Sequence, residues 1–292
     1  MIKVLVLGST GMLGHVVTNY LKQREYEVYT TSRNSNDEYY YDAIKDIHAI
    51  DKILTNIKPN FIVNCIGILN KDAEEHPSKA IMINSYLPHY LDEVSEKYGF
   101  KLIHVSTDCV FDGHEGNYTE NSIKTAQSIY GKTKGLGEID NNRSLTLRTS
   151  IIGPDSNPNG IGLFQWFMKQ EGKVNGFRQV IWTGVTTIEL AKQIEIAMKD
   201  NLTGLYNVVN GQKISKYDLL EIIKKVFNKN IEIIPDDNYV SDKSLVSIKE
   251  NYKFLIPDYY QMIVEMKDWI NTNGNLYEGV KYESNDNSGH KA

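Results

Sequence analysis

The N-terminal segment places a strand, a glycine-rich turn and a helix in direct succession. Residues 1–8 form an apolar run typical of a strand buried inside a parallel sheet. The pattern G-x-x-G-x-x-G follows, and then an amphipathic helix predicted over residues 16–23. Such a turn lets the backbone approach a pyrophosphate and lets the helix pack closely on the strand. We therefore predict a dinucleotide site formed by Gly8, Thr10, Gly11, Met12, Leu13 and Gly14.

Strands and helices continue to alternate as far as residue 153. Strands are predicted at 27–31, 61–67, 102–106 and 145–151. Helices are predicted at 47–57, at 77–98 despite Pro88, and at 129–138. This alternation predicts an α/β fold built on a doubly wound, Rossmann-like parallel sheet.

Beyond Gly153 the pattern changes to a turn-rich loop and shorter elements. An apolar segment at 163–168 precedes helices at 189–198, 217–227 and 259–270, and strands at 204–209 and 231–234. We predict a smaller C-terminal substrate-binding lobe from 154–184 and 209–272. Residues 185–208 are predicted to return to the dinucleotide-binding domain of residues 1–153. Residues 273–292 are polar and are predicted to form a disordered tail.

Charge and composition exclude several classes of function. The net charge of −5 and the lack of a basic cluster argue against a nucleic-acid partner. No apolar run reaches the length of a signal peptide or membrane span, so we expect no membrane partner and a cytoplasmic location. Cys65 and Cys109 are expected to be reduced and buried. The seven histidines show no metal-ligand spacing, so we assign no metal site.

A second motif carries acid–base chemistry. The strand at 102–106 ends on two hydroxyls, Ser106 and Thr107, and the predicted helix at 129–138 carries Tyr130 and Lys134 on one face. A free tyrosine has a pKa of about 10, and a neighbouring ammonium favours the phenolate. We therefore expect Lys134 to lower the pKa of Tyr130 while a strand-end hydroxyl holds a carbonyl oxygen. Such a set of side chains is suited to the reduction of a ketone or the oxidation of an alcohol.

The strand at 27–31 ends in T-S-R-N, without the carboxylate that usually selects NAD. Arg33 stands there instead, and its guanidinium can pair with a 2′-phosphate. A solvated surface arginine is the alternative interpretation. We favour NADPH as the cofactor, with NADH as the second choice.

Several motifs together resemble an extended short-chain dehydrogenase/reductase of the dTDP-4-dehydrorhamnose reductase-like group. They are G-S-T-G-M-L-G, V-S-T-D-C-V-F-D-G, Y-G-K-T-K-G-L-G-E and L-R-T-S, followed by T-G-V-T-T-I-E-L-A, G-L-Y-N-V-V and I-S-K-Y-D-L-L. The resemblance covers about residues 1 to 270. It implies hydride transfer from NADPH to the C4 ketone of a nucleotide-linked 6-deoxyhexose, in deoxysugar synthesis for surface polysaccharide.

The resemblance also assigns roles to individual residues. Thr107 would bind the ketone oxygen, Tyr130 would deliver the proton, and Lys134 would hold the nicotinamide ribose and tune Tyr130. Tyr130 would also contact the cofactor, and further cofactor contacts would come from Arg33, Asp42 (near the adenine), Cys65, Ile66, Gly67 and Asn84. Substrate contacts would come from Ser106, Asp108 and Lys243, with an ordinary surface lysine as the alternative for the last.

Three other functions remain to be weighed. Asp108 is followed by Cys109 and not by the glutamate of the 4,6-dehydratases, which makes a dehydratase a poor fit. A 4-epimerase would hold NAD tightly, and the strand-end carboxylate for NAD is missing here. A non-catalytic regulatory subunit, such as the methionine adenosyltransferase beta subunit, shares the glycine turn and Tyr-x-x-x-Lys.

The resemblance leaves the identity of the sugar open, because Ile151 replaces the bulky aromatic residue that usually follows R-T-S. It also implies a homodimer, as in many relatives.

Overall fold

The computed structural model describes residues 1–34, 39–280 and 282. These residues form a central sheet of six parallel strands in the order β2-β1-β3-β4-β5-β10. The strands are β1 (Ile2–Leu7), β2 (Tyr26–Thr30), β3 (Phe61–Asn64), β4 (Lys101–Thr107), β5 (Leu145–Thr149) and β10 (Gly204–Asn207). The predicted doubly wound parallel sheet is therefore confirmed.

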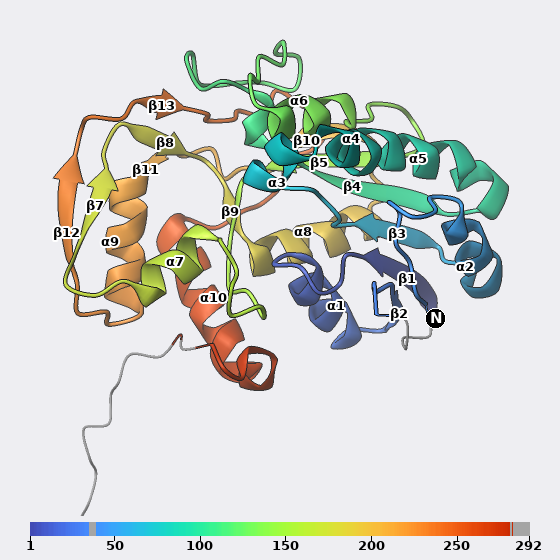
Figure 1. The fold of residues 1–292 in the computed structure, drawn as a ribbon, viewed down its shortest axis with the longest axis horizontal. Coiled ribbons are helices and arrows are strands. Elements are labelled where there is room, and N and C mark those ends of the chain that lie inside the picture. Colours follow the sequence, from blue (N-terminus) through green and yellow to red (C-terminus); the bar gives the residue numbers. More distant parts are fainter. Residues whose placement is uncertain (35–38, 281, 283–292) are drawn as a thin grey trace, which may run out of the picture.

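Helices cover both faces of the sheet (Figure 1). In β1, Val4 and Val6 belong to an apolar cluster with α1 and α8, whereas Leu5 and Leu7 belong to one with α2 and α5. Successive side chains of a strand point to opposite faces, so a strand covered on both sides needs apolar residues throughout. These helices are α1 (Gly14–Lys22), α8 (Thr187–Lys199), α2 (Ala49–Ile57) and α5 (Leu87–Tyr98).

The strand order reverses at β1. β2 lies on one side of β1, while β3 and the later strands continue on the other side. In such sheets the carboxyl ends of the two strands at the reversal border a crevice in which ligands bind. Gly8 follows β1 here, and a Cβ on Gly8 would lie 3.1 Å from the Cys65 carbonyl carbon that follows β3.

The helix predicted over residues 77–98 is present but is not uniform. It consists of α4 (Pro77–Ala80), the π-helical segment η1 (Ile81–Tyr86) and α5. Pro88 has no N–H to donate to the Asn84 carbonyl, so the helix widens, and the Leu87 N–H bonds instead to Met82 O. The wider turn lies beside Gly137, where a Cβ would approach Asn84 O to 1.9 Å.

The strand predicted over residues 145–151 is divided. β5 ends at Thr149, and β6 (Ile151–Ile152) leaves the main sheet to pair with β9 (Val185–Thr186). A Cβ on Gly184 would lie 2.2 Å from Ser150 O, so the glycine lets the two segments meet at this bend. The helices between β3 and β5 that remain are α3 (Asn70–Glu75), η2 (Asp108–Val110) and α6 (Ile129–Leu136).

The C-terminal lobe, at the left of Figure 1, is built from helices and short strands. β11 (Ile214–Ser215), β8 (Val180–Trp182) and β13 (Ser241–Asp242) form one small sheet, and β12 (Glu232–Asp236) pairs with β7 (Lys173–Phe177). The lobe's helices are α7 (Leu163–Lys169), α9 (Lys216–Val226) and α10 (Tyr259–Thr272). One apolar cluster runs from the main sheet into α7, α9 and α10, so the division into two domains stays a prediction.

The segment after α10 differs from the expected tail. Residues Gly274–Tyr277 form the short helix η3, and Tyr277 and Tyr282 are only 4% and 3% exposed. Their rings lie edge to face, and the Tyr282 ring also packs against Phe164. The prediction of a disordered tail is thus wrong for residues 273–280 and 282. Residues 281 and 283–292 lie outside the described residues.

Candidate functional site

Two adjoining cavities lie at the carboxyl ends of the parallel strands, lined by residues that the structure describes. The first has a volume of about 200 Å³ and the second about 410 Å³. Both are lined by Gly11 and by residues 65–67, so they form one continuous trough. The trough follows the crevice that the strand order creates, beside the turn after β1.

The glycine turn shapes the middle of this trough. Gly8 has a φ of 77°, and a Cβ on Gly14 would lie 2.0 Å from Gly8 O. A side chain at either position would therefore strain the turn or push α1 off the strand. Within the described chain no side chain caps the start of α1, and the His15 N–H donates to Gly11 O, so a ligand can bind the other N–H groups at the start of the helix. This uncapped, side-chain-free cradle fits the diphosphate of a dinucleotide.

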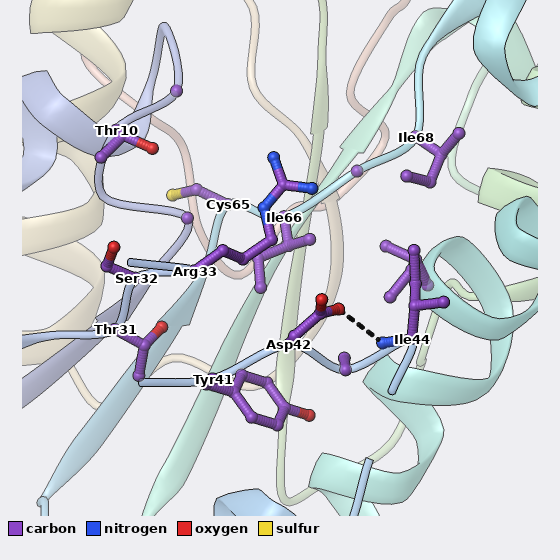
Figure 2. A pocket seen from close by; sticks show the side chains of 15 residues that line it. Thr10, Thr31, Ser32, Arg33, Tyr41, Asp42, Ile44, Cys65, Ile66 and Ile68 are labelled. Atoms are coloured by element: carbon purple, nitrogen blue, oxygen red, sulfur yellow. Dashed lines mark hydrogen bonds between the residues drawn. The ribbon is translucent and has the colours of Figure 1, made fainter. Parts of the chain in front are cut away.

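The first cavity contains the residues predicted to select the cofactor. Figure 2 shows the Arg33 and Asp42 side chains directed into it, opposite Cys65 and Ile66. Asp42 also accepts a hydrogen bond from Ile44 N at 3.1 Å, which orders the chain that follows it. A guanidinium at this place can bind a phosphate on the adenosine ribose.

The second cavity brings together the catalytic residues predicted from the sequence. Thr107, Tyr130 and Lys134 all line it. Ser128 caps α6 by accepting a hydrogen bond from Gly131 N at 3.1 Å. A Cβ on Gly131 would lie 2.1 Å from Cys109 O, so glycine lets α6 pack onto the turn after β4. This close approach puts Tyr130 beside Thr107.

Lys134 does not act on Tyr130 as the sequence analysis expected. Its ammonium donates to Val105 O at 2.7 Å and lies 3.3 Å from His104 Nε2. Burial raises the pKa of Tyr130, and the nearby Thr107 hydroxyl opposes this rise only in part. The expected lowering of the Tyr130 pKa is therefore absent from this structure, because burial outweighs the other effects and Lys134 is held by β4.

Burial of Lys134 gives a testable pH dependence. Burial lowers the pKa of Lys134 from 10.5 to about 8. Between these values the unfolded chain binds the proton more tightly than the folded chain, so Lys134 makes stability rise with pH. From pH 8 to 9.5 the free energy of unfolding should rise by about 1.5 kcal/mol more in the wild type than in Lys134→Met. Denaturant titrations at both pH values measure this, and parallel curves would contradict the burial of a charged Lys134.

The hydroxyl of Ser106 faces a buried ion pair. Ser106 Oγ donates to Glu138 Oε1 at 2.7 Å, although Ser106 also lines the second cavity. The Arg148 guanidinium binds Glu138 through both carboxylate oxygens, at 2.7 and 2.6 Å. The predicted substrate contact of Ser106 would therefore compete with its hydrogen bond to Glu138. Asp108, in contrast, lines the cavity and accepts a weak bond from Thr107 Oγ1, at 3.2 Å.

Some residues predicted for the site are not among the described residues that line either cavity. These are Gly14, Asn84 and Lys243. The Asn84 side chain instead bonds Ile68 N and Ile68 O, both at 2.9 Å, and so holds the loop that lines the trough. Lys243 packs over Gly113, beyond the turn that carries Cys109.

Other residues were missed by the sequence analysis. The second cavity is also lined by Leu69, Asn70, Val105, Cys109, Thr149, Ser150, Asp155, Ile161, Gly162 and Leu163, together with Ile151. The signal that was available is their position directly after strands or in the turn-rich loop that follows Gly153. Lys216 was missed as well, and its Nζ lies 4.9 Å from the Trp182 ring centroid. Burial lowers the pKa of Lys216 to about 8, and the nearby charge of Asp108 limits this decrease.

Neither a metal-binding cluster nor a membrane-spanning helix is found in the part of the chain that the structure describes. Residues 1–34, 39–280 and 282 contain no group of three or more His, Cys, Asp and Glu side chains arranged to hold a metal ion. The same residues include no helix of sufficient length and apolarity to span a bilayer.

Comparison with known proteins identifies relatives that match most of the chain. A family model described as RmlD substrate binding domain matches residues 2–243. The spore coat polysaccharide biosynthesis protein SpsK of Bacillus subtilis is 28% identical over 229 residues, which cover 76% of this chain and 78% of SpsK. The methionine adenosyltransferase 2 subunit beta of Xenopus tropicalis is 27% identical over 244 residues, covering 77% of this chain and 72% of that protein.

Solved structures show the same fold. The dTDP-4-dehydrorhamnose reductase of Bacillus anthracis, solved in complex with NADP, superposes with a TM-score of 0.77 at 22% identity. The match covers 94% of this chain and 100% of the reductase chain. The family match and this shared fold confirm the resemblance inferred from the sequence motifs.

Proposed function

This chain belongs to the RmlD substrate-binding-domain family, and on that basis we propose that it is an NADPH-dependent reductase of a nucleotide-linked 4-keto-6-deoxyhexose. The observation that carries the proposal is the meeting of Thr107, Tyr130 and Lys134 in one cavity that continues into the glycine turn. A dinucleotide along the trough and a sugar in the second cavity would meet at these side chains. The similarity to SpsK supports a role in polysaccharide precursor synthesis.

The residues of the second cavity suit the reducing direction. The reduced nicotinamide, when bound, supplies a hydride to the ketone carbon. Thr107 would donate a hydrogen bond to the ketone oxygen, and Tyr130 would transfer its proton to the same oxygen. Because burial raises the pKa of Tyr130, the phenol keeps its proton until the alkoxide forms. Lys134 would hold a ribose hydroxyl and keep a positive charge near the developing anion.

Arg33 supports NADPH over NADH. Its guanidinium reaches into the first cavity, at the end of β2, where the adenosine ribose of a dinucleotide lies in folds of this kind (Figure 2). A 2′-phosphate would gain charge-assisted hydrogen bonds from it. NADH has a hydroxyl in place of this phosphate and would not gain these charge-assisted hydrogen bonds.

The proposal is tested by turnover with a panel of nucleotide-linked 4-keto-6-deoxysugars, generated in place by a 4,6-dehydratase. Loss of NADPH absorbance and formation of the reduced sugar are followed with dTDP-, UDP- and GDP-linked members, and NADH is offered separately. We expect turnover with at least one member and a preference for NADPH. Saturable NADPH binding without turnover of any member would contradict the reductase proposal.

A second candidate function is that of an NADP(H)-binding regulatory subunit. The similarity to methionine adenosyltransferase 2 subunit beta favours it, because that relative is named as a subunit of another enzyme. The two proposals differ in one observable. A regulatory subunit would change the activity of a methionine adenosyltransferase when mixed with it and would leave every keto-sugar unreduced.

A further inference from the structure

The segment after α10, residues 273–280 and Tyr282, packs against both the glycine turn and the second cavity; we call it the C-terminal strap. It contacts the turn through Tyr277 and His15, and the cavity loop through Tyr282 and Asp155. Both tyrosines and His15 are at most 5% exposed. The strap lies outside residues 2–243, which match the family model.

Hydrogen bonds form a continuous chain from α10 to the glycine turn. Trp269 Nε1 donates to Tyr277 Oη at 2.8 Å, and Tyr277 Oη lies 3.1 Å from His15 Nε2. His15 Nδ1 lies 3.0 Å from Gly11 O. A carbonyl can only accept, so Nδ1 must carry the proton and Nε2 must accept from the tyrosine hydroxyl. Because the indole donates to the phenol oxygen, the phenol proton is free to point at His15, and every group has a partner.

The last bond of this chain helps to fix the orientation of a peptide in the turn. In a planar trans peptide the C=O and N–H point in opposite directions. Gly11 O is held by His15 Nδ1 and also by His15 N, at 3.0 Å. The N–H of Met12, which belongs to the same peptide, must then point away from the His15 ring. Gly11 and Met12 both line the second cavity, beside the uncapped start of α1.

Tyr282 holds the other wall of the second cavity. Its hydroxyl accepts from Asp155 N and donates to Asp155 O, both at 2.8 Å. Asp155 lies in the turn-rich loop that lines this cavity. The Phe164 ring, in α7, packs against the same tyrosine with ring centroids 5.1 Å apart. One strap therefore orders the phosphate-binding turn and the loop across from it.

We propose that Tyr277 and His15 are positioning residues that aim the Met12 N–H at the diphosphate of a bound dinucleotide, so that the C-terminal strap sets the affinity for the cofactor. The proposal rests on the function proposed above, since it requires a dinucleotide in the trough. Neither residue touches the reacting atoms. Loss of the strap contact should therefore weaken cofactor binding while leaving the proton-transfer residues in place.

The test compares Tyr277→Phe, His15→Phe and His15→Asn by NADPH binding. A lost hydrogen bond of this kind corresponds to roughly a 3- to 10-fold rise in Kd, which we expect for Tyr277→Phe and at least to the same extent for His15→Phe. Asparagine can place its amide where Nδ1 stands, so His15→Asn should recover affinity to within about 3-fold of the wild type. The matched control is Tyr252→Phe, which removes a remote hydroxyl bonded to Asp200.

Two measurements separate positioning from plain stabilisation. The KM for NADPH should rise in Tyr277→Phe while kcat stays near the wild-type value, and hydrogen exchange at Met12 and Leu13 should become faster. A lower melting temperature with an unchanged Kd for NADPH would overturn the proposal. Should the wild type bind no nicotinamide dinucleotide, the proposed function fails. In that case the hydrogen-exchange rate at Met12 is the remaining test of the positioning role. An equal rate in Tyr277→Phe and in the wild type would overturn that role too.

Discussion

Replacing Tyr130 with phenylalanine is expected to lower kcat of the keto-sugar reduction by about 10²- to 10⁴-fold, the range typical for loss of a general acid. The ring stays in place and only the hydroxyl beside Thr107 is lost, so the cavity keeps its shape. NADPH affinity should change little, because the glycine turn and Arg33 carry the proposed cofactor contacts. Burial raises the pKa of Tyr130, which keeps the donor protonated across the neutral range.

The measurement is steady-state kinetics of the purified variant with the member of the sugar panel that the wild type reduces. Tyr90→Phe is the matched control, since it removes a hydroxyl that donates to Asp51 Oδ1 at 2.6 Å, away from the cavities. Its kcat should equal that of the wild type. A kcat for Tyr130→Phe within about 3-fold of the wild type would assign the proton to another donor.

Replacing Arg148 with methionine is expected to reduce the free energy of unfolding by about 3–5 kcal/mol. The side chains of Arg148 and Glu138 are both 0% exposed, and the pair is bidentate. The variant would leave the Glu138 carboxylate buried, with Ser106 and Lys124 as its partners among the described residues. The cost arises because the buried Glu138 charge loses its bidentate partner, and the partly exposed Lys124 ammonium, 2.9 Å away, compensates for it only in part.

Denaturant unfolding of a double-mutant cycle measures this effect. Arg148→Met with Glu138→Leu should be more stable than Arg148→Met alone, because the second change removes a buried carboxylate that has lost its main partner. Arg143→Met is the control: its ion pair with Asp92 is partly exposed, and its loss should cost about 1 kcal/mol or less. A loss below that level for Arg148→Met would mean that water or another group replaces the guanidinium.

Local patterns in the sequence were sufficient to predict the central sheet and the order of its strands and helices along the chain. The apolar run of β1, the glycine turn and the alternation of strands and helices predicted the doubly wound sheet, which is confirmed. Tyr130 and Lys134 were placed together by helical spacing alone. Arg33 and Asp42 line the first cavity, as predicted from their places in the sequence. Their roles stay predictions until the kinetic tests are made.

Contacts between distant segments lay beyond those patterns. The partners of Lys134 come from β4, thirty residues away, and its own burial governs its pKa. The Asn84 side chain was expected at the cofactor but holds Ile68. Among the described short strands of the C-terminal lobe, which are two to five residues long, β12 was predicted at 231–234, but the others carry too little periodicity to be recognised.

The sequence by itself determined the parallel sheet, the glycine turn and the spacing of the candidate acid–base pair, because each depends on residues within about one helical turn or strand of one another. Only the tertiary structure decided which charges are buried and what the C-terminal strap does. Tyr277 is 262 residues from His15, and a polar segment becomes ordered only when another part of the chain satisfies its buried groups. Whether these buried groups find hydrogen-bond partners depends on the packed molecule and not on any local stretch of sequence.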